Sequence, residues 1–365
     1  MITNEIAGIG TSIWLDDLSR AKLKGMDPFS LPARIKNSGV VGVTTNPSIF
    51  NSAITGSTDY AADISSMKLL SPEEIVKKLT TDDVRDACDL FSEIYSKTAG
   101  VDGRVSIEVD PRLAHETEAT IAEGKSLWAV VDRPNLMIKV PATLAGLPAI
   151  TELIASGISV NVTLIFSCKR YEEVIDAFIS GIEDAHQRGL DVSKIHSVAS
   201  FFISRIDTAV DQQLKGIGTS SSSELLGKAA IANAVLAYEL FISKSSSPGW
   251  SKLREVGAHM QRPLWASTGV KDPAYEDTRY VTQLVAPNTV NTMPQSTLDA
   301  LIDHGKFQGD TISPAIAESH QVLAKLSASG VSLNSITDQL EIDGVAAFAK
   351  AWQALLDDVQ KARTA

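Results

Sequence analysis

The chain has 365 residues, of which 44% are hydrophobic and 21% are charged, and its net charge is −11. This composition is typical of a globular protein long enough for one large domain or two medium ones. The negative charge and the lack of lysine and arginine clusters argue against nucleic acid as a partner. The two cysteines, Cys88 and Cys168, form no CxxC pair, so we expect neither a disulfide framework nor a cysteine-based metal site.

The sequence suggests neither export nor a membrane span. The first twenty residues lack a basic segment followed by an apolar core, so we expect no secretory signal. The most apolar long stretch, 224–242, contains Glu224, Lys228, Asn233 and Glu239 and therefore predicts a core helix rather than a membrane span. We expect a cytoplasmic protein without a membrane partner.

Short strand-like runs alternate with helical patterns along the whole chain. Stretches 72–98 and 171–189 are examples of the amphipathic helical patterns. The strand-like runs are 12–16, 41–45, 105–109, 136–140, 158–164, 195–201, 263–267 and 288–293. This alternation predicts an α/β fold with a parallel sheet, and eight strands favour a (β/α)₈ TIM barrel with extra helices. The competing fold, an open doubly wound sheet, is disfavoured because no GxGxxG or GxxxxGK[ST] motif follows the first strand.

The chain is longer than such a barrel needs, and the surplus falls in two places. We expect a single (β/α)₈ domain over 1–365, because no flexible linker and no internal repeat divides the sequence. A helical insertion is expected around 206–262, with a serine loop at 220–223. A C-terminal helical extension is expected over 306–365, ending in a helix at 343–362.

One lysine stands out in NLMIKVPAT (135–143), because Lys139 interrupts an apolar run typical of a buried strand. A lysine is rarely buried without a partner, since taking an ammonium group out of water is costly. The ordinary alternative is a side chain that extends from a strand end into solvent.

Other polar residues share the position of this lysine. Side chains alternate between the two faces of a strand, and in a barrel the apolar face packs on the helices. The polar set should therefore point into the barrel near the C-terminal strand ends, where active sites of this architecture lie. Each residue alone could instead cap a helix or lie at the rim, but together they predict one site. They are Asp16, Asn46, Glu108, Lys139, Asn161, Thr163 and Ser200.

Several reaction types were weighed for this set. Glu108, Asp110 and His196 offer possible metal ligands, but the six histidines are scattered and show no HExxH-type spacing. A serine hydrolase lacks its GxSxG elbow. Pyridoxal chemistry also uses a lysine and stays open. A lysine amid carboxylates, amides and hydroxyls fits Schiff-base chemistry on a carbonyl substrate, in which the amine attacks a ketone.

Five motifs resemble those of a known family: VTTNPSIF (43–50), VSIEVDPRL (105–113), LMIKVPAT (136–143), NVTLIFS (161–167) and SFFISRID (200–207). They are similar to the signatures of transaldolases, class I Schiff-base enzymes of the pentose phosphate pathway. The ending DGVAAFAKAWQALL resembles the C-terminus of the longer bacterial members. The resemblance implies a (β/α)₈ barrel with its lysine on the fourth strand.

The resemblance also implies a role for each site residue. Lys139 would form the Schiff base, and Asp16 would be the acid/base of C–C cleavage. Glu108 and Thr163 would position the water that shuttles protons. The substrate-binding residues would be Asn46, Asn161 and Ser200 for the dihydroxyacetone unit, Arg205 for the phosphate, Phe202 beside the site, and Lys271 where a second arginine is expected. A further departure is Phe201, where many members have proline.

These observations predict a transaldolase that moves a dihydroxyacetone unit from sedoheptulose 7-phosphate to glyceraldehyde 3-phosphate, or the reverse. We expect no metal and no organic cofactor, small sugar phosphates as substrates, and a monomer or homodimer. Two alternatives stay open: a fructose 6-phosphate aldolase that releases free dihydroxyacetone, and a non-catalytic barrel that binds phosphosugars.

Overall fold

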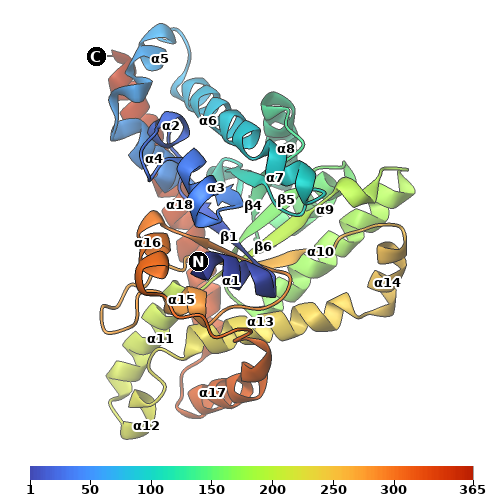
Figure 1. Ribbon diagram of the computed structural model, residues 1–365, viewed down its shortest axis with the longest axis vertical. Coiled ribbons are helices and arrows are strands. Elements are labelled where there is room, and N and C mark those ends of the chain that lie inside the picture. The colour runs from blue at the N-terminus through green and yellow to red at the C-terminus, as the bar shows by residue number, and fades with distance from the viewer. Residues whose placement is uncertain (365) are drawn as a thin grey trace.

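Eight parallel strands form a closed barrel in the order β1 to β8 (Figure 1), in a computed structural model that describes residues 1–364. Each predicted run overlaps one strand, so the predicted (β/α)₈ fold is confirmed. The strands are β1 (Thr11–Asp16), β2 (Gly42–Thr44), β3 (Arg104–Glu108), β4 (Leu136–Pro141), β5 (Val160–Ile165), β6 (Ser197–Phe202), β7 (Arg262–Ala266) and β8 (Thr289–Met293).

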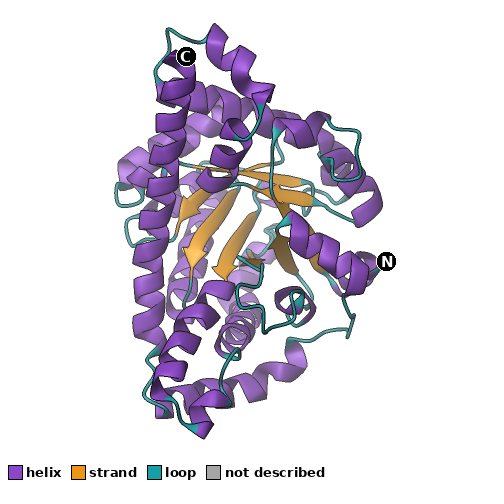
Figure 2. Ribbon diagram, turned by 90° about the vertical axis from the view of Figure 1, so that its left-hand side faces the viewer, coloured by secondary structure: helices purple, strands orange, loops and turns teal. Residues whose placement is uncertain are grey.

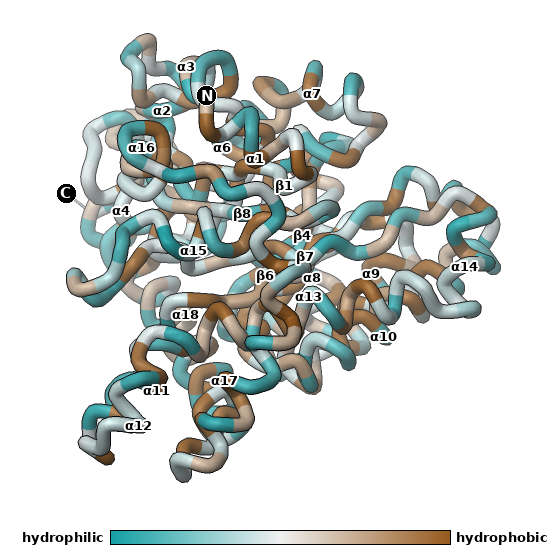
Figure 3. Tube along the Cα trace, turned by 60° about the horizontal axis from the view of Figure 1, so that its bottom comes forward, coloured by the Kyte–Doolittle hydropathy of each residue, from teal (hydrophilic) through white to brown (hydrophobic). Residues whose placement is uncertain are grey.

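Helices connect successive strands and cover the outside of the barrel. α10 shows how they pack: it buries Tyr171, Val174, Phe178 and Ile182 at helical spacing, and its hydropathy alternates accordingly (Figure 3). The helices are α1 (Ile2–Ile9), α2 (Arg20–Lys24), α3 (Leu31–Ser38), α4 (Pro47–Thr55), α5 (Ala61–Ser66), α6 (Pro72–Leu90), α7 (Ser92–Lys97), α8 (Thr117–Val131), α9 (Gly146–Ala155), α10 (Cys168–Gln187), α11 (Ser204–Ile217), α12 (Ser220–Ser223), α13 (Ala229–Ser245), α14 (Pro248–Glu255), α15 (Arg279–Thr282), α16 (Gln295–His304), α17 (Ile316–Ala328) and α18 (Leu333–Thr364).

Three predicted helical details differ from the structure. The helix expected over 72–98 is divided into α6 and α7 at Phe91. The expected serine loop 220–223 is a helical turn, because the Thr219 side chain accepts a hydrogen bond from the Ser222 backbone and caps it. The apolar helix expected over 224–242 begins only at Ala229. None of the described helices combines the length and apolarity that crossing a membrane requires.

The C-terminal helix α18 lies across the end of the barrel at which the strands terminate. It packs on α4, α6 and α11, which follow strands β2 and β6, and on β5 itself. In Figure 2 the strand arrowheads point toward this long helix, which runs down one side of the molecule. An ion pair of 3.1 Å between Arg170 of α10 and Glu341 of α18 fixes it further. The extension predicted at the C-terminus therefore contributes to the barrel mouth.

A bulge in β5 interrupts the predicted alternation of its side chains. The register with β6 shifts between Val162 and Ile165, and Leu164 has a positive φ of 61°. Leu164 then packs against α18: a Cβ atom on Gly344 would lie 3.0 Å from Leu164 Cδ2. Glycine at this position lets the helix approach the strand closely.

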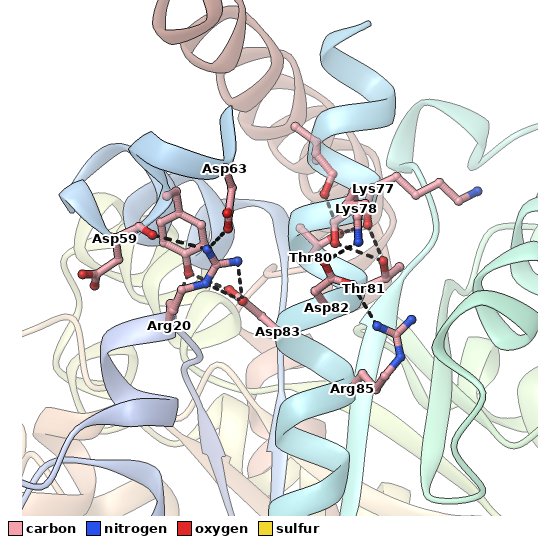
Figure 4. Close-up of polar contacts among 12 residues, drawn as sticks. Arg20, Asp59, Asp63, Lys77, Lys78, Thr80, Thr81, Asp82, Asp83 and Arg85 are labelled. Carbon is pink, nitrogen blue, oxygen red and sulfur yellow. Dashed lines mark hydrogen bonds and ion pairs between the residues drawn. The ribbon is translucent and has the colours of Figure 1, made fainter. Parts of the chain in front are cut away.

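A buried ionic network holds the segments that follow β1 and β2 against α6 (Figure 4). Arg20 Nε and Nη2 each donate to Asp83 Oδ1 at 3.1 Å, and Tyr60 Oη donates to Asp83 Oδ2 at 2.6 Å. The Arg20 guanidinium also lies 4.4 Å from the centroid of the Tyr60 ring. Asp83 is 1% exposed, so these partners compensate its burial. The network connects Arg20 of α2, which follows β1, and Tyr60, which follows α4, to Asp83 of α6.

Candidate functional site

Sheet register places the predicted polar residues at one level of the barrel. Glu108 of β3 pairs with Lys139 of β4, and Lys139 pairs in turn with Asn161 of β5. Side chains of paired residues on neighbouring strands point to the same face. Asp16 ends β1, and Asn46 follows β2 directly. The predicted residues therefore gather at the C-terminal end of the barrel.

Lys139 is buried, with 4% of its surface exposed, so it does not extend into solvent. Its Nζ donates a hydrogen bond to the backbone oxygen of Thr45 at 3.0 Å. The same atom lies 3.5 Å from Glu108 Oε2 and 5.6 Å from the centroid of the Phe348 ring. A carboxylate, a carbonyl oxygen and an aromatic face thus surround one buried amine.

Glu108 is placed to exchange protons with this amine. Burial raises its pKa to about 7, although the charge of Lys139 acts in the opposite direction. Apart from the ion pair, neither carboxylate oxygen has a hydrogen-bond partner among the described residues, and the same holds for Thr163 Oγ1. Buried oxygens of this kind ordinarily bond to a protein group or to water. Glu108 and Thr163, the two residues predicted to position a water, thus both have unused hydrogen-bonding atoms.

Asp16 is the second carboxylate, and it is not a helix cap. Ser19 caps α2, and Asp17 forms an ion pair with Lys22. Asp16 Oδ1 accepts a hydrogen bond of 2.6 Å from Thr44 Oγ1, which also contacts Thr292 Oγ1 at 2.7 Å. Burial raises the pKa of Asp16, and the charge of Lys139 opposes this shift. The hydroxyl pair fixes the direction of this carboxylate.

Amides and hydroxyls complete the polar lining. Ser200 Oγ donates to Asn161 Oδ1 at 2.7 Å, and Asn161 Nδ2 donates to Ser106 Oγ at 3.0 Å. Asn46 is the N-cap of α4, since its Oδ1 accepts a hydrogen bond of 3.0 Å from the Ile49 backbone. Asn46 therefore caps a helix, which is the alternative expected for a single polar residue, and it also lines the cavity.

A cavity of about 120 Å³ opens at this end of the barrel. The predicted residues that line it are Asp16, Asn46, Lys139, Ser200, Phe202, Arg205 and Lys271. Glu108 instead lines a neighbouring cavity of about 240 Å³, which shares Asn46. Asn161 and Thr163 belong to β5 and line neither cavity.

A model of the transaldolase/fructose-6-phosphate aldolase family matches residues 13–359. The chain belongs to this family. A transaldolase of Mycolicibacterium smegmatis is 53% identical over 357 residues, which cover 97% of this chain and 95% of that protein. A transaldolase of Arthrobacter sp. is 54% identical over 362 residues, covering 99% and 97%. Transaldolase 1 of Streptomyces avermitilis is 54% identical over 352 residues, covering 96% and 92%.

Two cationic side chains, Arg205 and Lys271, lie at the edge of the cavity. Arg205 is the second residue of α11, and its guanidinium carbon lies 5.3 Å from the centroid of the Phe202 ring. Burial lowers its pKa, and it forms no ion pair with any of residues 1–364. Lys271 is exposed at the rim of the same cavity. An unpaired, half-buried guanidinium suits an anionic ligand group.

The structure adds residues that sequence reasoning missed. Phe348 of α18 lines the cavity and covers the amine of Lys139. No local pattern pointed to it, because it is one of several apolar residues in a C-terminal helix. Thr44 donates a hydrogen bond to Asp16, and Thr292 contacts Thr44 in turn. Thr44 could have been predicted from the sequence, because it lies on the inward face of the second strand.

Of the two other candidate metal ligands, His196 lies apart from the site, whereas Asp110 lines the same neighbouring cavity as Glu108. His196 precedes β6 at the other end of the barrel, and Asp110 pairs with Arg112 at 2.7 Å. Within the part of the chain that the structure describes, no three His, Cys, Asp or Glu side chains are arranged to hold a metal ion.

Proposed function

We propose that this protein is a cytoplasmic transaldolase that acts through a Schiff base on Lys139. It would transfer a dihydroxyacetone unit from sedoheptulose 7-phosphate to glyceraldehyde 3-phosphate and catalyse the reverse reaction, in the non-oxidative pentose phosphate pathway. The observation that carries this proposal is the buried Lys139 amine beside Glu108, next to a polar cavity. Family membership supports the same reaction.

The first half of the reaction forms the Schiff base. The neutral amine of Lys139 attacks the C2 carbonyl of the ketose and gives a carbinolamine. Glu108 accepts a proton from the amine and returns one to the departing hydroxyl through the water held with Thr163, so that water leaves and the imine forms. A carboxyl group whose pKa is about 7 can serve in both directions at neutral pH.

The second half breaks and forms the C–C bond. Asp16 takes the proton of the C4 hydroxyl while the C3–C4 bond breaks, and the bond electrons pass to the iminium as an enamine. The aldose leaves, and the acceptor aldehyde takes its place. The enamine attacks its carbonyl carbon while Asp16 returns the proton to the new hydroxyl. Water then hydrolyses the imine and frees Lys139.

The remaining residues would hold the substrate. Asn46, Asn161 and Ser200 offer amide and hydroxyl groups for the dihydroxyacetone hydroxyls. Arg205, assisted by Lys271, would bind the phosphate, with Phe202 supporting the guanidinium. Because lysine supplies the electrophilic activation, the reaction needs no metal and no organic cofactor. The active unit would be a monomer or a homodimer.

Trapping with borohydride tests the proposal directly. The protein is incubated with fructose 6-phosphate and borohydride, digested, and mapped by mass spectrometry. We expect a reduced three-carbon adduct on Lys139 and none in Lys139→Met. Lys22→Met is a matched control, because Lys22 is also ion-paired but lies outside the cavity. An adduct on another lysine, or no adduct, would refute the Schiff-base assignment. Release of more than one equivalent of erythrose 4-phosphate per enzyme only when glyceraldehyde 3-phosphate is supplied would distinguish transfer from simple aldol cleavage of sedoheptulose 7-phosphate.

A further inference from the structure

A second, larger cavity lies at the opposite end of the barrel from the predicted active site. Its volume is about 480 Å³, within the range of small-molecule sites. It is bounded by the starts of β6 and β7 and by helices α13 and α14, with Ser197, Arg262, Phe241 and Trp250 among the lining residues. We call this space the lower cavity.

The lower cavity is cationic in an acidic protein. The chain has 44 Asp and Glu residues against 33 Lys and Arg, yet the residues that line this cavity include no carboxylate. They do include two arginines, Arg254 and Arg262, and two histidines, His196 and His259, whose lowered pKa values leave them neutral at pH 7. Arg262 is already bound to Asp102 at 3.0 Å. Arg254 is exposed and forms no ion pair within residues 1–364, so its charge is available to a ligand.

One polar atom without a hydrogen-bond partner belongs to a residue that lines the lower cavity, and a second lies close to it. His196 is 7% exposed, and its Nε2 has no hydrogen-bond partner among the described residues. Nη2 of the fully buried Arg104 also lacks one. The two atoms lie near each other, since a Cβ atom added to Gly100 would lie 3.1 Å from each of them. Buried polar groups without partners are uncommon in native structures, and these two can still donate or accept a hydrogen bond.

The pKa values of the two histidines reflect positive charge near their rings. Their rings stack with centroids 4.5 Å apart. Burial, followed by the charges of Arg104, His259 and Arg262, lowers the pKa of His196 to about 2. The pKa of His259 is lowered by burial and by Arg104 as well. The field at these imidazoles is therefore positive, and an anion in the cavity would be attracted.

The lower cavity also has an apolar side. Trp250 and Phe241 line it, together with Met137 and Met260. Aromatic and apolar surfaces with a few convergent polar groups are the usual composition of a ligand site. We propose that the lower cavity binds a small phosphate monoester, whose charged group contacts Arg254 and the two histidines and whose ring or chain packs on Trp250 and Phe241.

Calorimetry with phenyl phosphate tests this site, because the probe combines a dianion with an aromatic ring. The experiment uses the full-length Arg205→Ala/Lys271→Ala protein, in which phosphate binding at the cavity beside Lys139 should be weakened. We expect about one equivalent of probe to bind, and Arg254→Glu in this background to weaken binding at least about ten-fold, as expected for loss of a charge-assisted contact. Arg254→Lys should bind with intermediate affinity. Lys252→Ala is the matched control, because Lys252 is exposed on the same helix but does not line the cavity.

Nuclear magnetic resonance of the histidine rings gives a second readout. Phenyl phosphate should shift the imidazole nitrogen signals of His259 and His196, whereas neutral benzyl alcohol should shift them much less. The proposal is overturned if no binding is detected at millimolar probe, or if Arg254→Glu and Lys252→Ala bind equally well. Neither result bears on the Schiff base, which borohydride trapping at Lys139 tests independently.

Discussion

The ammonium nitrogen of Lys139 lies 3.5 Å from a carboxylate oxygen of Glu108, and each side chain is at most 5% exposed. An isolated buried charge would be costly, so each group stabilises the charged form of the other. A proton can pass between them, directly or through one water, without a large rearrangement. This pair links the stability of the fold to the proposed chemistry.

The first prediction follows from the raised pKa of Glu108. Its pKa is about 7 when folded against 4.5 ordinarily, so the folded state binds more protons between these values. The contribution of Glu108 to the free energy of unfolding therefore falls as pH rises from 4.5 to 7. Glu108→Gln lacks this titration. The free energy of unfolding of the variant minus that of the wild type should increase by about 2–3 kcal/mol over this window and stay constant above it.

Urea unfolding of both proteins at several pH values measures this difference. Because the comparison is between pH values, any effect of the substitution that does not depend on pH cancels. A difference that does not change with pH would show that Glu108 titrates normally.

The second prediction concerns Asp16. Asp16→Asn should fold and still be trapped by borohydride at Lys139, but its turnover should fall by about 10²–10⁴-fold, the usual contribution of positioned proton transfer. Asp17→Asn is the matched control, since Asp17 is the neighbouring carboxylate and pairs with Lys22 outside the cavity. Melting temperature, trapping and kcat are measured on both variants. Turnover of Asp16→Asn close to wild type would exclude the acid/base role.

The third prediction concerns the phosphate contact. Arg205→Ala should lower kcat/KM for fructose 6-phosphate, because a charge-assisted hydrogen bond is lost. The corresponding activation free energy should rise by about 1.5–3 kcal/mol. The loss for unphosphorylated fructose should be small. Lys215→Ala, also on α11 but paired with Asp272, is the control. Equal losses on the two sugars would mean that Arg205 supports the structure only.

The fourth prediction concerns the cover that α18 places over the site. Phe348→Ala should open the space above Lys139 and lower the free energy of unfolding by about 3 kcal/mol, as for other buried Phe→Ala changes. Water would then reach the covalent intermediate more easily. We expect more free dihydroxyacetone per transfer event, measured by coupled assays of both products, while Phe348→Leu should stay closer to wild type. If Phe348→Ala is destabilised but its ratio of free dihydroxyacetone to transfer product is unchanged, Phe348 contributes only to packing.

The barrel and much of its site could be predicted from the sequence alone, because both depend on local pattern. Strand residues alternate between two faces, so Glu108 and Lys139 were expected to point inward from the order of apolar and polar residues around them. Strand order also placed these residues at one end of the barrel, since parallel strands terminate together. The motifs around them predicted the family that the comparisons then showed.

Tertiary structure decided what depends on contacts between distant segments. Phe348 reaches Lys139 only because α18 crosses the barrel mouth, and no local pattern encodes where a C-terminal helix packs. The β5 bulge that turns Leu164 toward Gly344 is likewise set by packing rather than propensity. The raised pKa of Glu108 arises from burial, which the surrounding elements create jointly. Side-chain type and spacing are local properties, whereas desolvation and the approach of remote helices are properties of the assembled fold.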